Sequence, residues 1–158
     1  MSDFTIRFAE VSDSATILQF IKGIAEYEKL SDLVEATTEK IEKHLFAQGA
    51  VAKCLLAFED ETPVGFALFF SNYSTFVSKP GIYLEDLFVE PEFRGKGYGK
   101  SLLLELIKIA KQRDCGRVEW SVLDWNQPAI DFYESLGAKP IHGWTVYRLD
   151  EKAINSFD

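Results

Sequence analysis

Residues 94–100 contain three glycines at alternate positions and three cations, a pattern that suits a phosphate group. The segment reads Arg94-Gly95-Lys96-Gly97-Tyr98-Gly99-Lys100 and follows an apolar, strand-like stretch at residues 82–89. Glycine lets the backbone approach a ligand closely. An amphipathic stretch follows, and the start of a helix offers unpaired N–H groups and a positive dipole end. We therefore expect this segment to bind a phosphorylated ligand, a pyrophosphate in particular.

Two other phosphate-binding loops fit the segment badly. A Walker loop requires Gly-x-x-x-x-Gly-Lys-Ser/Thr, but Arg94 stands where its first glycine would be. A dinucleotide-binding fingerprint requires Gly-x-Gly-x-x-Gly, whereas Gly95-x-Gly97 is followed by Lys100. The loop therefore belongs to a different class of phosphate site.

Two adjacent carboxylates, Glu85 and Asp86, interrupt the apolar stretch before the loop. Neighbouring residues of a strand point to opposite faces, and a buried carboxylate is costly unless it is paired or hydrogen-bonded. Two interpretations follow for either acid: a structural ion pair with Arg7 or Lys22, or a carboxylate that faces a substrate amine.

Glu28 is a third candidate acid, next to Tyr27 in the sequence. It follows Ile24 by four residues, which places it at the end of an apolar helix face. On spacing alone, Glu28 reaches water at a frayed helix end.

A third group of residues surrounds a short helix expected over residues 128–136. Asn126 precedes this helix and suits its N-terminal cap, while Pro128 falls in the first turn, where its missing N–H costs nothing. Ala129 and Tyr133 share one face of the helix. From spacing alone, Tyr133 is a core residue whose hydroxyl is satisfied locally.

The elements that must position these residues alternate between strands and helices. Hydrophobic periodicity predicts strands at residues 4–9, 51–59, 64–72, 81–89, 117–123 and 144–149. It predicts helices at residues 13–28, 38–47, 97–113 and 128–136. The strands at 51–59 and 64–72 form a hairpin. The unit around the glycine loop must be a right-handed parallel crossover, so the sheet is mixed and mostly antiparallel, with helices on both faces.

The composition restricts the class of protein. At 158 residues with 47% hydrophobic and 14% aromatic residues, the chain is expected to form one domain, 1–158, with a substantial core. The net charge of −8 disfavours nucleic acid; it suits a cationic substrate or serves solubility alone. No apolar run is long enough for a membrane, and no signal peptide is recognisable, so we expect a cytoplasmic protein. Isolated Cys54 and Cys115 and two histidines predict no metal site.

The motifs resemble those of the GNAT acetyltransferase superfamily. Residues 94–99 match its Arg/Gln-x-x-Gly-x-Gly/Ala loop, and residues 126–137 resemble its Asn-x-x-Ala-x-x-Phe-Tyr-x-x-x-Gly motif, with Ala138 in place of the usual aromatic residue. Within the superfamily, the segments 21–28, 64–67, 83–89 and 125–128 are most similar to spermidine/spermine and thialysine N-acetyltransferases. The segment between Gly137 and Trp144 is shorter than expected for the mammalian enzymes and carries His142.

The resemblance implies an α/β (α+β) GNAT fold of about six to seven strands, and acetyl-CoA as co-substrate without a metal. It implies that Tyr133 is a general acid toward the leaving thiolate and Glu85 a base, with a β-bulge opening a slot for the pantetheine arm. It implies substrate-binding residues Tyr27, Glu28, Glu85 and Asp86. It implies cofactor-binding residues Leu87, Phe88, Val89, Arg94, Gly95, Lys96, Gly97, Tyr98, Gly99, Lys100, Asn126, Pro128, Ala129 and Tyr133.

The acceptor implied is a small cationic amine: a polyamine, a diamine or a lysine-like amine. The resemblance also implies a homodimer whose interface lies near residues 144–148. Two alternatives stay open. One is an acetyltransferase for a peptide amine, a protein amine or an antibiotic, because one fold hosts many functions. The other is a non-catalytic acyl-CoA-binding module.

Overall fold

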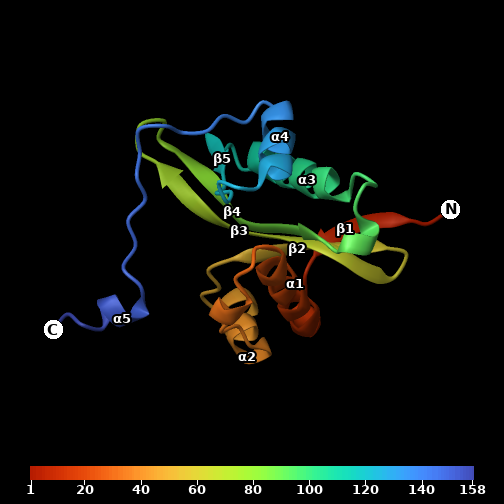
Figure 1. Ribbon diagram of the computed structural model, residues 1–158, viewed down its shortest axis with the longest axis horizontal. Helices are drawn as coiled ribbons and strands as arrows, with labels where there is room; N and C mark the ends of the chain where they lie inside the picture. The colour runs from red at the N-terminus through yellow and green to blue at the C-terminus, as the bar shows by residue number, and fades with distance from the viewer. The chain divides into compact units, whose positions relative to one another are not determined.

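The computed structural model describes all residues, 1–158, and divides the chain into two compact units, Met1–Ser121 and Val122–Asp158. Figure 1 shows the elements of each unit. The prediction of one domain over 1–158 stays a prediction.

The first unit is built on a five-stranded sheet in the order β1-β2-β3-β4-β5. The first four strands are antiparallel to their neighbours, and β5 runs parallel to β4, as the crossover through the glycine loop requires. A turn at Asp60 and Glu61 joins β2 to β3, which confirms the predicted hairpin. The strands are β1 (Phe4–Phe8), β2 (Lys53–Glu59), β3 (Thr62–Ser74), β4 (Lys79–Val89) and β5 (Arg117–Glu119).

Helices cover both faces of this sheet, as the order of the strands and helices predicts (Figure 1). On one face lie α1 (Ser14–Tyr27), α2 (Thr38–Ile41) and its π-helical continuation η3 (Glu42–Phe46). On the other face lies α3 (Tyr98–Gln112), which follows the short 3-10 turn η4 (Pro91–Phe93). The remaining short helices of the unit are η1 (Val11–Asp13) and η2 (Ser31–Leu33).

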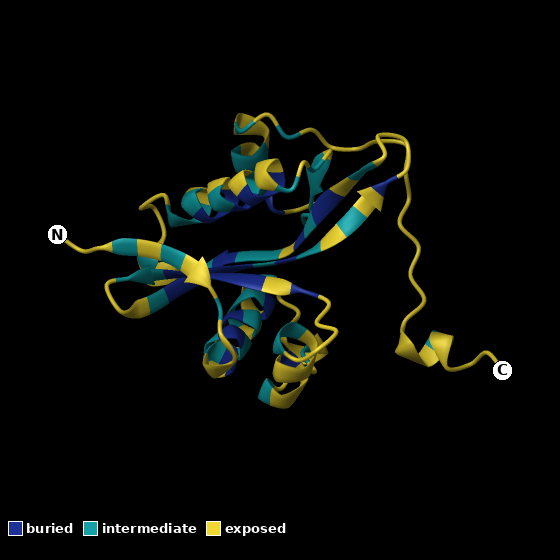
Figure 2. Ribbon diagram, turned by 180° about the vertical axis from the view of Figure 1, so that it is seen from behind, coloured by how far each residue is buried: buried dark blue, intermediate teal, exposed yellow.

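The core lies between the sheet and these helices, where Figure 2 shows buried residues on the inner strands and on the facing helix surfaces. On the α1 side, Phe20 packs near Phe66 and Phe88, with ring centroids 5.4 and 6.2 Å away. A Cβ at Gly23 would meet the Phe88 ring at 2.8 Å, so a side chain there would displace this ring or push α1 away from β4. On the α3 side, one helix stripe is buried: Leu102, Leu103, Leu106, Ile109 and Ala110.

The second unit contains two helices, α4 (Gln127–Ser135) and α5 (Glu151–Ile154), and no strand. The prediction of a strand at residues 144–149 is therefore wrong, and so is the count of six to seven strands. The segment has the strand-like composition, but a strand forms only with a hydrogen-bonding neighbour, and within this chain it has none. The strand predicted at 117–123 is likewise only Arg117–Glu119 long.

Candidate active site

The glycine loop joins η4 to α3 and has the geometry of a backbone cradle. Gly95 and Gly97 have φ of +82° and +83°, a region that side-chain-bearing residues rarely adopt. A Cβ at either position would meet no atom within 4 Å, so the space beside both residues is open. Gly97 is the N-cap of α3 and no side chain caps it, so the first N–H groups of α3 lack an intrahelical partner. The loop therefore fits an anionic ligand bound through main-chain N–H groups.

Two side chains of this loop turn toward the sheet. The Lys96 ammonium lies 3.0 and 3.2 Å from the carboxylate oxygens of Glu59, and the Tyr98 hydroxyl donates to the same carboxylate at 2.6 Å. The Tyr98 ring also stacks on Phe4, with centroids 4.1 Å apart and planes 5° apart. Sequence reasoning missed Glu59 because 37 residues separate it from Lys96 and nothing in its local sequence marks it.

Arg94 links the loop to both β4 and α1. Its Nε donates to the Val89 carbonyl at 2.8 Å, and its guanidinium lies 5.0 Å from the ring centroid of Tyr27 and 5.4 Å from that of Phe88. Lys100, in the first turn of α3, is exposed. The loop thus brings Arg94 beside three other predicted site residues, Tyr27, Phe88 and Val89.

A β-bulge interrupts β4 at Glu85. Leu68 of β3 faces Asp86 and Phe69 faces Leu84, which leaves Glu85 as the extra residue on β4. Beyond the bulge, the sheet opens on the other side of β4, because the ladder to β5 ends at the Tyr83–Glu119 pair.

The main chain at the end of β4 presents groups to this opening. The Glu90 N–H bonds to Val64 of β3, and main-chain groups alternate in direction along a strand. The groups of Leu87 and Val89 therefore face away from β3, where the Val89 carbonyl accepts from Arg94. This edge can receive an extended ligand through main-chain hydrogen bonds.

Asp86 lies on the α1 side of β4, and two other carboxylates, Glu85 and Glu28, are near enough to act on its charge. Asp86 pairs with Leu68, which packs against the α1-facing core, and Phe88 two residues further on belongs to that core. Burial, together with the nearby charges of Glu85 and Glu28, raises the pKa of Asp86 to about 6. Burial also raises the pKa of Glu28, which caps the end of α1. This part of the structure therefore brings together predicted substrate-binding acids in a setting that favours a bound cation.

The ion-pair interpretation for the β4 acids is not supported at Arg7. Arg7 instead pairs with Asp13, at 2.8 Å. This pairing, with the hydrogen bonds that accompany it, holds the pKa of Asp13 below its usual range. Arg7 is therefore a structural partner at the start of α1.

In the second unit, α4 brings together the other predicted residues. The buried Asn126 caps the helix by accepting from the Ala129 N–H at 3.4 Å, and Pro128 lies in the first turn. The rings of Phe132 and Tyr133 lie 5.5 Å apart. The cap predicted for Asn126 is thereby confirmed, and its contact with a cofactor stays a prediction.

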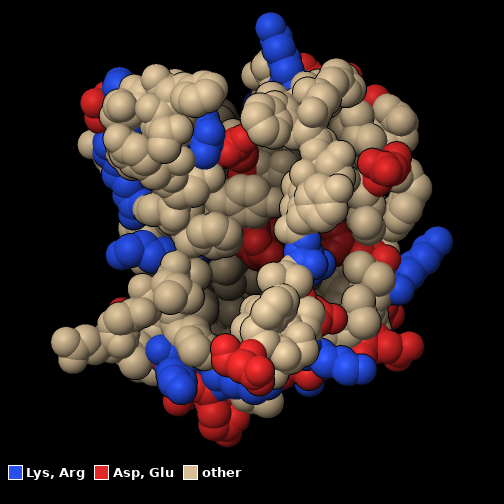
Figure 3. Space-filling model, turned by 90° about the vertical axis from the view of Figure 1, so that its left-hand side faces the viewer, with Lys and Arg blue, Asp and Glu red and all other residues tan.

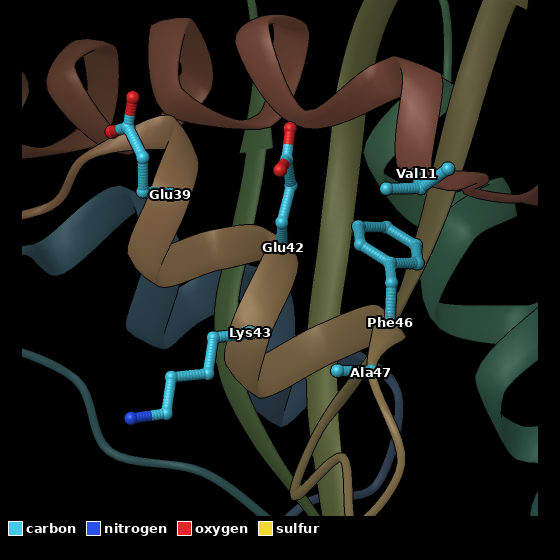
Figure 4. A pocket seen from close by; sticks show the side chains of 6 residues that line it. All are labelled: Val11, Glu39, Glu42, Lys43, Phe46 and Ala47. Carbon is cyan, nitrogen blue, oxygen red and sulfur yellow. The ribbon is translucent and has the colours of Figure 1, made fainter.

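Two surface hollows are lined by other residues. One hollow, of about 500 Å³, lies beside α2 and η3. Figure 4 shows the residues that line it: Val11, Glu39, Glu42, Lys43, Phe46 and Ala47. A second lies beside Lys22 and Glu26. Neither contains a predicted site residue. The candidate site is instead defined by the glycine loop, the β4 edge and the acids beside it.

Three further properties describe the molecule as a whole. No helix combines the length and the apolar character needed to cross a membrane. No group of three or more His, Cys, Asp or Glu side chains is placed to hold a metal ion. Both acidic and basic side chains are visible in Figure 3, and the net charge of −8 is not the basic balance that is typical of nucleic-acid binding.

Comparisons with known proteins agree with this geometry. Residues 20–138 match the model of the acetyltransferase (GNAT) family. Thialysine N-epsilon-acetyltransferase of Sus scrofa is 35% identical over 98% of this chain and 96% of its own length. L-ornithine N5-acetyltransferase of Arabidopsis thaliana is 46% identical over 63% of this chain and 43% of its own.

A solved structure also matches over nearly the whole chain. An integron cassette protein from the mobile metagenome of V. cholerae superposes with a TM-score of 0.80 at 26% identity, over 97% of this chain and 96% of its own. The mixed sheet and the glycine loop before α3 agree with these matches. The family model and a relative that matches over almost its whole length show that the chain belongs to the acetyltransferase (GNAT) family of enzymes.

Proposed function

We propose that this enzyme transfers the acetyl group of acetyl-CoA to a primary amine of a small cationic substrate: a polyamine, a diamine or a lysine-like amine. The observation that carries the proposal is the cluster of Glu28, Glu85 and Asp86 beside the bulge of β4, in which burial and neighbouring charge raise the pKa of Asp86 to about 6. A bound ammonium would offset the mutual repulsion of these acids. The names of the thialysine and ornithine acetyltransferases support the same class of acceptor.

Members of this family use acetyl-CoA as co-substrate, which supplies an acetyl thioester when bound. The open space beside Gly95 and Gly97 and the unpartnered N–H groups at the start of α3 suit its pyrophosphate. The edge of Leu87 to Val89 suits its pantetheine arm, with Phe88 packed behind that edge in the core. For Asn126, Pro128, Ala129 and Tyr133 of the second unit, binding of the cofactor is proposed from the family motif alone.

The chemistry proposed for the side chains concerns protons. A primary amine has a pKa of about 10 and arrives protonated, so a base must free its lone pair before attack. Glu85 is proposed to accept this proton, directly or through water, while Glu28, Asp86 and Tyr27 hold the substrate cation. The N–H groups near Leu87 to Val89 stabilise the oxygen that gains negative charge. Tyr133 is proposed to donate its hydroxyl proton to the departing thiolate, so that the acetylated amine and CoA are released.

We also propose that the enzyme is a cytoplasmic homodimer. The segment 144–149 is rich in apolar and aromatic residues, yet it has no strand partner within its own chain. Its large side chains are exposed, with Trp144 at 78%, Val146 at 87% and Tyr147 at 92%. Exposed apolar surface of this kind marks a protein-binding site, and pairing with a second copy would supply both burial and hydrogen-bonding partners. A sedimentation run that finds only monomer at micromolar concentration would exclude this part of the proposal.

The experiment that tests the activity is release of free CoA thiol from acetyl-CoA at slightly alkaline pH. The acceptors are spermidine, putrescine, thialysine and a lysine-containing peptide. We expect turnover with a free amine. Tyr133→Phe should reduce this turnover at least tenfold, because general-acid catalysis contributes about 10²–10⁴-fold to the rate. Preference for the peptide would reassign the acceptor, and acetyl-CoA binding without turnover on any of them would contradict the proposed acceptor class.

A further inference from the structure

Glu59 lies at the end of β2, outside the parts of the molecule that carry the family motifs. It is opposite Phe4 of β1 and Thr62 of β3, so three strands hold its backbone in place. Its side chain is only 15% exposed, and it accepts hydrogen bonds from Lys96 and Tyr98 at once. The hydrogen bond from Tyr98, followed by that from Lys96, lowers the pKa of Glu59 below its ordinary value. The carboxylate is therefore ionised at neutral pH.

The two partners of Glu59 occupy alternate positions of the glycine loop, one on each side of Gly97. Gly97 has a positive φ and open space beside it, so no neighbouring side chain packs on this residue to hold it in place. The loop is held instead through its neighbours. Lys96 and Tyr98 bond to Glu59, and the Tyr98 ring also stacks on Phe4.

This arrangement also decides where the charge of Lys96 acts. Its ammonium is paired with Glu59 at 3.0 Å, and a cation held by a carboxylate is partly neutralised toward other anions. The loop then attracts an anion chiefly through its main-chain N–H groups and through its other cations, Arg94 and Lys100. Lys96 is thereby a structural link of the loop, although its position in the motif suggests a direct ligand.

We propose that Glu59 is a positioning residue that holds the glycine loop, through Lys96 and Tyr98, in the conformation that binds the pyrophosphate of acetyl-CoA. The inference rests on the proposed use of acetyl-CoA. It assigns Lys96 and the Tyr98 hydroxyl to Glu59 and leaves the attraction of phosphate to the main-chain N–H groups, Arg94 and Lys100. The pre-organised loop spares the ligand the cost of ordering it.

The test measures acetyl-CoA affinity by isothermal titration calorimetry for the wild-type enzyme, Glu59→Gln, Lys96→Met and the double variant. Each single variant should raise Kd roughly three- to tenfold, because it removes a charge-assisted hydrogen bond that holds the loop. The double variant should bind acetyl-CoA no more weakly than the weaker-binding single variant, because both changes break the same ion pair between Glu59 and Lys96. If Lys96 bound phosphate directly, Glu59→Gln would release it and leave Kd unchanged or lower, whereas Lys96→Met would raise Kd. That pattern would overturn the proposal.

Kinetics separate positioning of the loop from general damage to the fold. In Glu59→Gln, KM for acetyl-CoA should rise while kcat and KM for the amine stay near wild-type values. KM for acetyl-pantetheine, which lacks the pyrophosphate, should not change. A comparable rise in KM for acetyl-pantetheine would assign the effect to the whole fold and refute the proposal.

Two further variants keep the test interpretable. Asp114→Asn removes the carboxylate of an exposed ion pair with Lys79 and should leave acetyl-CoA affinity unchanged. Tyr98→Phe keeps the ring that stacks on Phe4 and removes only the hydroxyl, so it should give a smaller rise in Kd even if Glu59→Gln folds poorly. Wild-type enzyme that binds no acetyl-CoA would refute the proposed function itself. Wild-type binding with unchanged Kd in both Glu59→Gln and Tyr98→Phe would refute only the role of Glu59.

Discussion

The guanidinium of Arg94 lies 5.0 Å from the ring centroid of Tyr27, which places the first residue of the glycine loop on the last residue of α1. Through its Nε, Arg94 also bonds to the carbonyl of Val89 at the end of β4. Tyr27 precedes Glu28, so this contact connects the proposed phosphate site with the acids proposed to bind the amine. We infer that the two substrate sites share a structural support.

Tyr27→Leu should therefore weaken the binding of both substrates. An exposed cation–π contact contributes about 0.5–1 kcal/mol, which predicts a rise of about two- to fivefold in KM for acetyl-CoA and for the amine. Steady-state kinetics with each substrate varied in turn would measure it. Tyr73→Leu, at a tyrosine of β3 that is 58% exposed, is the matched control. A rise confined to one substrate would contradict the shared support.

The raised pKa of Asp86 predicts that stability depends on pH. A carboxyl whose pKa is higher in the folded than in the unfolded protein contributes stability below its unfolded pKa, and that contribution is lost as pH rises through about 6. Asp86→Asn removes the buried charge, so it should raise the free energy of unfolding at pH 7.5 by on the order of 2 kcal/mol relative to wild type. At pH 4 the two proteins should differ little.

Chemical denaturation of both proteins at the two pH values would measure this difference. Asp114→Asn, at an exposed carboxylate, provides a control that should show no such gain. Equal stability of Asp86→Asn and wild type at pH 7.5 would mean that Asp86 is compensated in the folded protein.

Glu85→Gln and Asp86→Asn should separate the base from the acid that binds the cation. Loss of a general base costs about 10²–10⁴-fold in rate, so Glu85→Gln should lower kcat by at least tenfold with little change in Kd for acetyl-CoA. Asp86→Asn should mainly raise KM for the amine. A base with the pKa of Asp86 would make the rate rise with pH near pH 6. If Asp86→Asn instead loses turnover together with this rise, the base is Asp86.

Gly97→Ala should cost both stability and cofactor affinity. A side-chain-bearing residue at positive φ costs about 1–2 kcal/mol, and a Cβ there would also project into the open space beside the loop. Gly49→Ala is a close control, because Gly49 has φ +81° and equally open surroundings away from the site. Thermal unfolding should show similar losses for both variants, whereas calorimetry should show weaker acetyl-CoA binding for Gly97→Ala alone. Equal affinities in the two variants would argue against the cradle.

The local features of this protein could be predicted from its sequence. Alternating glycines before an apolar helix stripe identify the loop and α3, because backbone freedom and helical periodicity depend only on neighbouring residues. The hairpin of β2 and β3, the parallel crossover and the cap at Asn126 follow from equally local patterns. The family could be identified in the same way, because the motifs at residues 94–99 and 126–137 are each short and continuous in the chain.

The tertiary structure decided the features that depend on distant partners. Residues 144–149 look like a strand, but a strand requires a neighbour, and the chain offers them none. Glu85 becomes the bulge only through the register between β3 and β4. Lys96 looks like a phosphate ligand until the fold brings Glu59 within 3.0 Å of it. Register and long-range ion pairs arise from the packing of whole elements, so the residues concerned carry no local signal of them.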